Sequence, residues 1–123
     1  TFAGYYGRII QRLKEMRPDA KFFLMTMPKS DKGEIDDKKK QGHAKVLYDM
    51  AEKFDNTYVI DLYKYAPVYD AEFRKNFYLL GHMNPMGYML TAKMTAAYID
   101  YIIRQNPDEF KHVGFIGTNI KYK

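Results

Sequence analysis

His82 is the side chain in this sequence best suited to acid–base chemistry. It follows Gly81 and stands just ahead of Asn84 and Pro85, a pair that predicts the cap and the first residue of a helix. A histidine held in a loop over the end of a sheet can act as a general base, because its unperturbed pKa lies near the pH at which most enzymes work. The alternative interpretation is a surface histidine without a chemical role.

Other catalytic groups are scarce. Ser30 is the only serine, and it lacks the flanking glycines of a nucleophile elbow, so we interpret it as a surface loop residue. The chain has no cysteine, which excludes disulfides, thiolate ligands and a cysteine nucleophile, and is compatible with a reducing compartment such as the cytoplasm. The three histidines lie far apart in the sequence and no glycine-rich phosphate loop is present, so we expect no metal and no cofactor.

Aromatic residues crowd the segment 63–78, which leads toward His82. Aromatic rings offer broad apolar faces, and tyrosine adds a polar handle, so this segment could line a pocket for an acyl chain or a sugar ring. The alternative is that the rings only pack the loop onto a sheet. The residues that we expect to face a substrate are Tyr63, Tyr65, Tyr69 and Asn84.

Apolar residues at helical spacing predict an amphipathic helix over residues 2–17 and a second over about 40–54, with a polar surface loop at 29–41 between the first strand and that helix. Two short apolar runs, 22–27 and 57–62, predict buried strands. A short helix is expected at 70–76, a long one from Asn84 to about Gln105, and a last short strand at 113–116. Strands that alternate with helices indicate the α/β class, with a parallel sheet and helices on both of its faces.

Length, charge and composition limit the classes of function that remain possible. The chain has 123 residues, which suits one domain, and 46% of them are hydrophobic. The formal charge is +5, but the basic residues are not gathered with aromatics on one helix face, so we expect no nucleic-acid partner. No apolar run approaches the ~20 residues of a membrane span. Thr1 leads directly into a helical pattern, so we expect further sequence before it, which leaves a signal peptide and the compartment open.

The stretch 81–88, Gly-His-Met-Asn-Pro-Met-Gly-Tyr, resembles the last sequence block of SGNH/GDSL serine hydrolases, the esterases and acylhydrolases in which a histidine precedes the closing helix. The stretch RPDAKFFLMTMP is similar to the approach to the family's fourth strand, and NTYVIDLY is similar to its fifth. The resemblance covers nearly the whole chain but only the second half of the family's domain. It implies that residues 1–123 are one partial domain, the C-terminal portion of a three-layer α/β/α, flavodoxin-like parallel sheet.

By this resemblance, His82 would take the proton from a serine hydroxyl during cleavage of a small ester such as a lipid or an acetylated sugar. The family's Gly-Asp-Ser nucleophile and oxyanion donors precede the matched region, so we expect them in an upstream portion of the same gene product and expect this chain alone to be inactive. The family's aspartate, three residues before the histidine, is replaced here by Leu79. The alternative is a non-catalytic carbohydrate- or partner-binding module on a degenerate fold, and a truncated product without function is a third reading.

The resemblance also places strand 22–27 inside a larger sheet. We therefore expect its outer edge to be paired by a second copy of the chain, by an N-terminal fragment of the same fold, or by the tail at 113–116. An unpaired apolar strand edge is a template for association.

Overall fold

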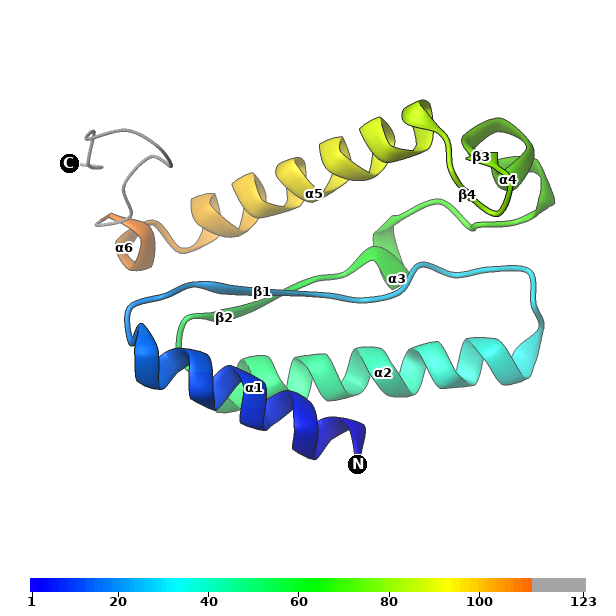
Figure 1. The fold of residues 1–123 in the computed structure, drawn as a ribbon. Helices are drawn as coiled ribbons and strands as arrows, with labels where there is room; N and C mark the ends of the chain where they lie inside the picture. Colours follow the sequence, from blue (N-terminus) through cyan, green and yellow to red (C-terminus); the bar gives the residue numbers. More distant parts are fainter. Residues whose placement is uncertain (112–123) are drawn as a thin grey trace.

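The structure, a computed structural model, describes residues 1–111. Its elements in chain order are α1 (Phe2–Met16), β1 (Phe22–Met25), α2 (Glu34–Lys53), β2 (Thr57–Ile60), α3 (Leu62–Tyr65), α4 (Ala71–Phe77), β3 (Tyr78–Leu79), β4 (His82–Met83), α5 (Pro85–Gln105) and α6 (Pro107–Phe110) (Figure 1). None of the helices in this part of the chain has the length and apolar character needed to cross a membrane.

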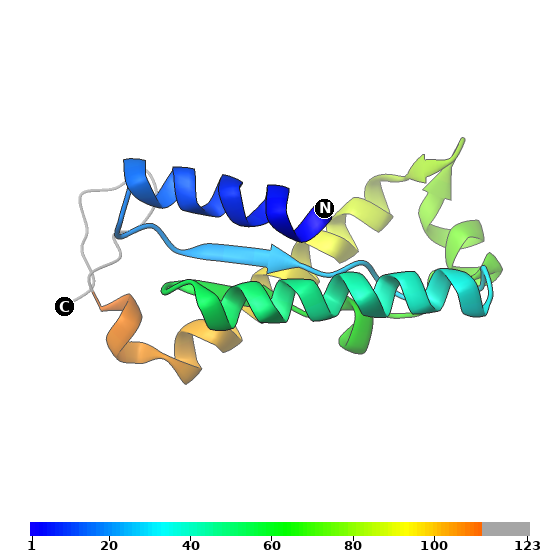
Figure 2. The ribbon, with the colours of Figure 1, turned by 90° about the horizontal axis from the view of Figure 1, so that it is seen from below.

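The central feature is a parallel pair of strands. β1 and β2 run side by side, in register from Phe22 opposite Thr57 to Met25 opposite Ile60, with α2 as the connection between them. Helices α1 and α2 lie against one face of this pair, and α5 and α6 lie against the other (Figures 1 and 2). The predicted α/β class and the parallel pairing are confirmed, and within residues 1–111 the parallel sheet has two strands.

Two apolar clusters explain why both strands, apart from Thr57, consist of apolar and aromatic residues. Successive residues of a strand point to opposite faces, so a sheet covered on both faces needs apolar residues at every position. Val59 packs with one cluster and its neighbour Ile60 with the other. The first cluster has Ile10, Leu24, Leu47 and Val59 at its centre, and the second has Ile60, Leu62, Ile102 and Phe110.

The structure corrects the predicted start of the second helix. α2 begins at Glu34, inside the segment predicted as a loop. Three acidic residues in its first turn favour a helix start, because carboxylates stabilise the positive end of the helix dipole. Ion pairs at i,i+4 spacing, Glu34 with Lys38 and Asp36 with Lys40, support the turns that follow.

The remaining differences are local. Strand β2 ends at Ile60 because the Asp61 side chain accepts a hydrogen bond from the Lys64 N–H and caps α3. Asn106 does end α5, as predicted, but Pro107 then starts the short helix α6. The hairpin β3–β4 was not predicted. The strand predicted at 113–116 lies outside the described residues.

Candidate functional site

His82 lies on a short β-hairpin. β3 and β4 pair antiparallel, with Leu79 directly opposite His82. The two residues between them, Leu80 and Gly81, have φ of 49° and 83°. Positive φ at both central residues is the backbone of the tight turn that matches the twist of a hairpin. The position that the resemblance assigns to a carboxylate, Leu79, is therefore the cross-strand neighbour of His82.

The hairpin projects at the end of the molecule toward which β1 and β2 run (Figure 1). Its tip is apolar and exposed: 65% of Leu79 and 93% of Leu80 are accessible, and His82 is exposed as well. Among residues 1–111, no hydrogen bond joins the His82 ring to a carbonyl or a carboxylate. The ring is therefore accessible, and no carbonyl or carboxylate of this part of the chain orients it.

Asn84 and Gly87 fasten the hairpin to α5. The Asn84 side chain accepts a hydrogen bond from the Gly87 N–H at 2.9 Å and donates one to the Asn76 carbonyl at 2.9 Å, while the Asn84 N–H donates to the Phe77 carbonyl at 2.8 Å. Gly87 is buried at this junction, where a Cβ would stand 2.4 Å from the Phe77 carbonyl oxygen and 3.2 Å from Met83 Cβ. The absence of a side chain at Gly87 lets the first turn of α5 approach the hairpin that carries His82.

Replacing Gly87 with alanine should therefore destabilise the protein by about 1–3 kcal/mol, because backbone on both sides must shift to admit the methyl group. The matched control is Gly42→Ala in the interior of α2, where a Cβ meets nothing within 4 Å. That change should raise the free energy of unfolding by about 0.5–1 kcal/mol through helix propensity. Urea unfolding of both variants measures the two effects, and a neutral Gly87→Ala would show that the junction is looser than described.

A buried polar network closes the carboxyl ends of the two strands. Asp61, which is 5% exposed, accepts hydrogen bonds from the Thr26 hydroxyl at 3.1 Å and the Tyr48 hydroxyl at 2.7 Å. Thr26 Oγ1 in turn accepts the Tyr63 N–H at 2.8 Å. Burial, and then the hydrogen bond to Asp61, raise the pKa of the Tyr48 phenol above its ordinary value, so this hydroxyl stays a donor. The network ties β1, α2 and α3 together and has a structural role.

Ser30 is held in an ion pair. Its hydroxyl donates to Asp36 Oδ2 at 2.7 Å and accepts from Lys40 Nζ at 2.8 Å, and Lys40 and Asp36 pair at 2.9 Å. Hydrogen bonds from Lys40, and then from Ser30, lower the pKa of the Asp36 carboxyl. The serine hydroxyl thus donates its proton to the Asp36 carboxylate and accepts from Lys40, and no histidine is bonded to it within residues 1–111. The geometry supports a structural role for Ser30.

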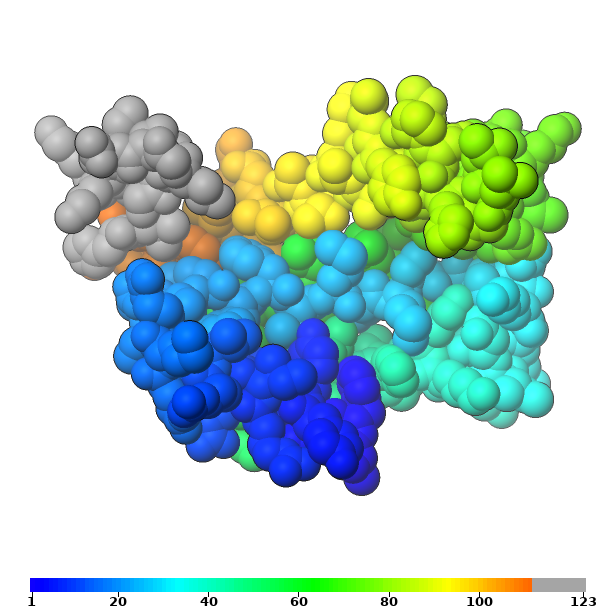
Figure 3. Space-filling view, in the orientation of Figure 1, coloured from blue at the N-terminus to red at the C-terminus, as the bar shows by residue number. Residues whose placement is uncertain are grey.

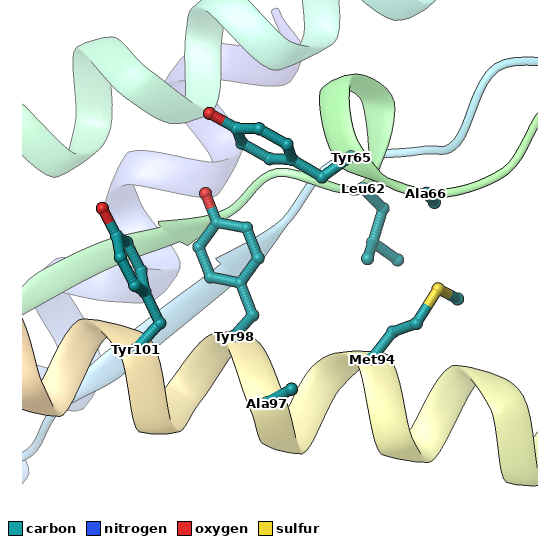
Figure 4. Close-up of a pocket in the computed structure, with 7 residues that line it drawn as sticks. All are labelled: Leu62, Tyr65, Ala66, Met94, Ala97, Tyr98 and Tyr101. Carbon is teal, nitrogen blue, oxygen red and sulfur yellow. The ribbon is translucent and has the colours of Figure 1, made fainter.

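A groove of about 540 Å³ opens between α3 and α5. Tyr98 and Tyr101 rise from α5, and their hydroxyls point away from that helix; Tyr65 reaches in from α3 beside them (Figure 4). The ring centroids of Tyr65 and Tyr98 are 5.9 Å apart, and those of Tyr98 and Tyr101 are 6.0 Å apart. The lining is Leu62, Tyr65, Ala66, Met94, Ala97, Tyr98 and Tyr101. Flat apolar rings with hydroxyl tips suit a sugar ring or an acyl chain.

Of the four residues predicted to face a substrate, the structure places Tyr65 on this groove and the other three elsewhere. Tyr63 bonds to Asp37 through its hydroxyl, Tyr69 is buried and stacks on Phe73 with ring centroids 4.0 Å apart, and Asn84 caps α5. Sequence reasoning missed the rings from α5. Their signal was present, since Met94, Ala97, Tyr98 and Tyr101 share one helix face at i, i+3, i+4 and i+7 spacing.

No three His, Cys, Asp or Glu side chains of residues 1–111 gather in a way that could hold a metal ion. Two features of this part of the chain that could do chemistry or bind a ligand are the exposed His82 hairpin and the tyrosine groove. Comparison with known proteins adds no relative: no family model, no curated protein and no solved structure matches this chain.

Proposed function

We propose that this chain is the base-supplying part of an SGNH/GDSL-like serine ester hydrolase, with His82 as the general base. The observation that carries the proposal is the placement of His82: exposed, on a hairpin locked to a capped helix, with its ring free of hydrogen bonds to the rest of residues 1–111. The resemblance of residues 81–88 to the family's last block supports it. The two parallel strands would then belong to a larger three-layer sheet, and the substrate would be a small ester such as a lipid or an acetylated sugar.

In this proposal the imidazole of His82 takes the proton of a serine hydroxyl as the serine oxygen attacks the ester carbonyl. The imidazolium then gives that proton to the alkoxide oxygen that leaves, and the same cycle with water releases the acid and restores the serine. Because the Ser30 hydroxyl bonds to Asp36 and Lys40 and not to His82 within the described residues, the nucleophile would come from another segment. That segment, expected upstream in the same gene product, would also carry the oxyanion donors.

Purified residues 1–123 should therefore show no turnover of short-chain p-nitrophenyl esters, because the resemblance places the nucleophile and the oxyanion donors upstream of this chain. The assay compares the chain with His82→Ala and Ser30→Ala variants. Turnover that persists in the His82→Ala variant would show that His82 is not the general base. Turnover that disappears with Ser30→Ala would show that Ser30 is the nucleophile after all.

A second candidate function is carbohydrate binding without catalysis, and the tyrosine groove is the observation that favours it. Calorimetric titration with soluble cello-oligosaccharides tests it, using Tyr98→Ala in the groove and Tyr5→Ala on the exposed surface of α1 as the matched control. Binding that is lost only with Tyr98→Ala, in a protein that has no esterase activity when the upstream segment is present, would favour the binding module.

A further inference from the structure

The tyrosine groove between α3 and α5 is built for a neutral ligand. Every side chain that lines it is uncharged, and three of them are tyrosines. Tyr65 and Tyr101 stand on either side with 63% and 57% of each residue exposed, and Tyr98 lies half-buried between them. The Lys64 ammonium, 5.1 Å from the centre of the Tyr65 ring, disfavours a cation in the groove. Apolar ring faces and hydrogen bonds, and not charge, would therefore hold the ligand.

The tyrosine hydroxyls favour a sugar over an acyl chain. Those of Tyr98 and Tyr101 point away from α5 into the groove, with Tyr65 beside them (Figure 4). Burial raises the pKa of the Tyr98 phenol, and the charge of Asp61 also raises it, so this hydroxyl stays protonated at neutral pH. An acyl chain laid over these rings would bury hydroxyls without a partner, at a cost of about 1–3 kcal/mol for each. A sugar instead lays its C–H face on a ring and offers hydroxyls of its own as partners.

The face of α5 that lines the groove leads to the hairpin that carries His82. Met94 and Thr91 are neighbours on this face, one turn apart. The Thr91 hydroxyl donates to Met83 Sδ at 3.3 Å, and Met83 follows His82 in β4. From Met94 back to the first residue of α5 the helix axis rises about 14 Å. A ligand that fills the groove and also reaches the hairpin is therefore an oligosaccharide and not a single sugar.

The groove lies away from the edge at which a larger sheet would grow. Further strands would be added beyond β1, on the side of the molecule where the segment around β1 lies at the surface between α1 and α5 (Figure 3). Within residues 1–111 the groove is lined from α3, which follows β2, and from α5, without a residue of α1 or β1. We propose that the tyrosine groove holds the glycan part of the ester that His82 cleaves, so that the substrate is an acylated oligosaccharide. This inference rests on the proposed ester chemistry.

Calorimetric titration of the chain tests the binding step without the chemistry. The probes are soluble acetylated cello-, xylo- and manno-oligosaccharides. Tyr101→Ala removes an exposed ring of the groove, and Tyr5→Ala removes a similarly exposed ring on α1 as the matched control. We expect at least one probe to bind the parent, Tyr101→Ala to weaken that binding about tenfold or more, and Tyr5→Ala to bind like the parent.

No binding of any probe, or an equal loss in both variants, would overturn the inference. If circular dichroism shows that Tyr101→Ala does not fold, Tyr65→Ala replaces it, because it truncates the other exposed ring of the groove.

Kinetics in a protein that joins this chain to the proposed upstream serine segment test the link to His82. Tyr101→Ala should raise KM for the acetylated oligosaccharide that binds about tenfold more than it raises KM for p-nitrophenyl acetate, which has no glycan. Hydrolysis of both esters should depend on His82. A larger effect of Tyr101→Ala on p-nitrophenyl octanoate than on the oligosaccharide would place an acyl chain in the groove and overturn the inference.

Failure of this inference and failure of the proposed function give different results. Hydrolysis of p-nitrophenyl acetate that depends on His82, with no specific effect of Tyr101→Ala on the oligosaccharide, would overturn the inference alone. Oligosaccharide binding in the groove without any ester hydrolysis that depends on His82 would overturn the proposed function and this inference with it, and would support the binding module.

Discussion

Replacing His82 with alanine is expected to lower kcat for ester hydrolysis by about four orders of magnitude or more, in a protein that joins this chain to the upstream serine segment that we propose. The serine hydroxyl is a weak nucleophile until a base takes its proton, and within residues 1–111 the accessible His82 is the group that we assign to that step. The fall should appear in kcat more than in KM, since the imidazole acts in the transition state.

His43→Ala is the matched control for this change. His43 is also exposed, but it stacks on Phe2 with ring centroids 4.5 Å apart, on the α2 side of the molecule. Its loss should leave kcat unchanged. Leu79→Asp gives a second check, because it places a carboxylate directly opposite His82 in the hairpin. If that carboxylate orients the imidazole, hydrolysis should be faster than in the parent protein, and the gain should vanish in the double variant with His82→Ala.

Replacing Asp61 with alanine should lower the free energy of unfolding by about 2–4 kcal/mol. The carboxylate accepts hydrogen bonds from the Thr26 hydroxyl, the Tyr48 hydroxyl and the Lys64 N–H, and its loss leaves the proton of the 2%-exposed Thr26 hydroxyl without an acceptor. Chemical unfolding followed by circular dichroism measures the change.

Asp49→Ala is the control for Asp61→Ala, because the Asp49 carboxylate pairs with Lys45 in solvent, and such pairs contribute about 0–1 kcal/mol. Tyr48→Phe and the double variant with Asp61→Ala complete a double-mutant cycle, which isolates the contribution of the hydrogen bond between Tyr48 and Asp61. If Asp61→Ala lowered the free energy of unfolding no more than Asp49→Ala does, this network would not stabilise the carboxyl ends of the strands.

The helices α1 and α5 and the two parallel strands followed from the sequence because their signals are strong and local. Apolar spacing marked α1, the pair Asn84-Pro85 marked the start of α5, and two short apolar runs marked β1 and β2. The predicted start of α2 was wrong because a polar and charged stretch such as 29–41 is typical of a surface loop. Those charges favour a helix once the acidic ones stand in its first turn and pair with lysines one turn later.

The hairpin that carries His82 could not be predicted from its turn residues. Tight hairpin turns usually have Asn-Gly or Asp-Gly at the two central positions, whereas here Leu80 takes the left-handed conformation before Gly81. The tyrosine groove was found only in part, because Tyr65 on α3 and Tyr98 on α5 become neighbours through the packing of elements far apart in the sequence.

Chemical rescue with imidazole tests the assignment of His82 most directly. The His82→Ala variant leaves a space where the ring stood, and imidazole in solution can take the serine proton in its place. We expect added imidazole to restore part of the lost kcat of His82→Ala, with no effect on the parent protein or on His43→Ala. A His82→Ala variant that hydrolyses esters at the parent rate, or a large loss that imidazole does not relieve, would contradict the role of His82 as the general base.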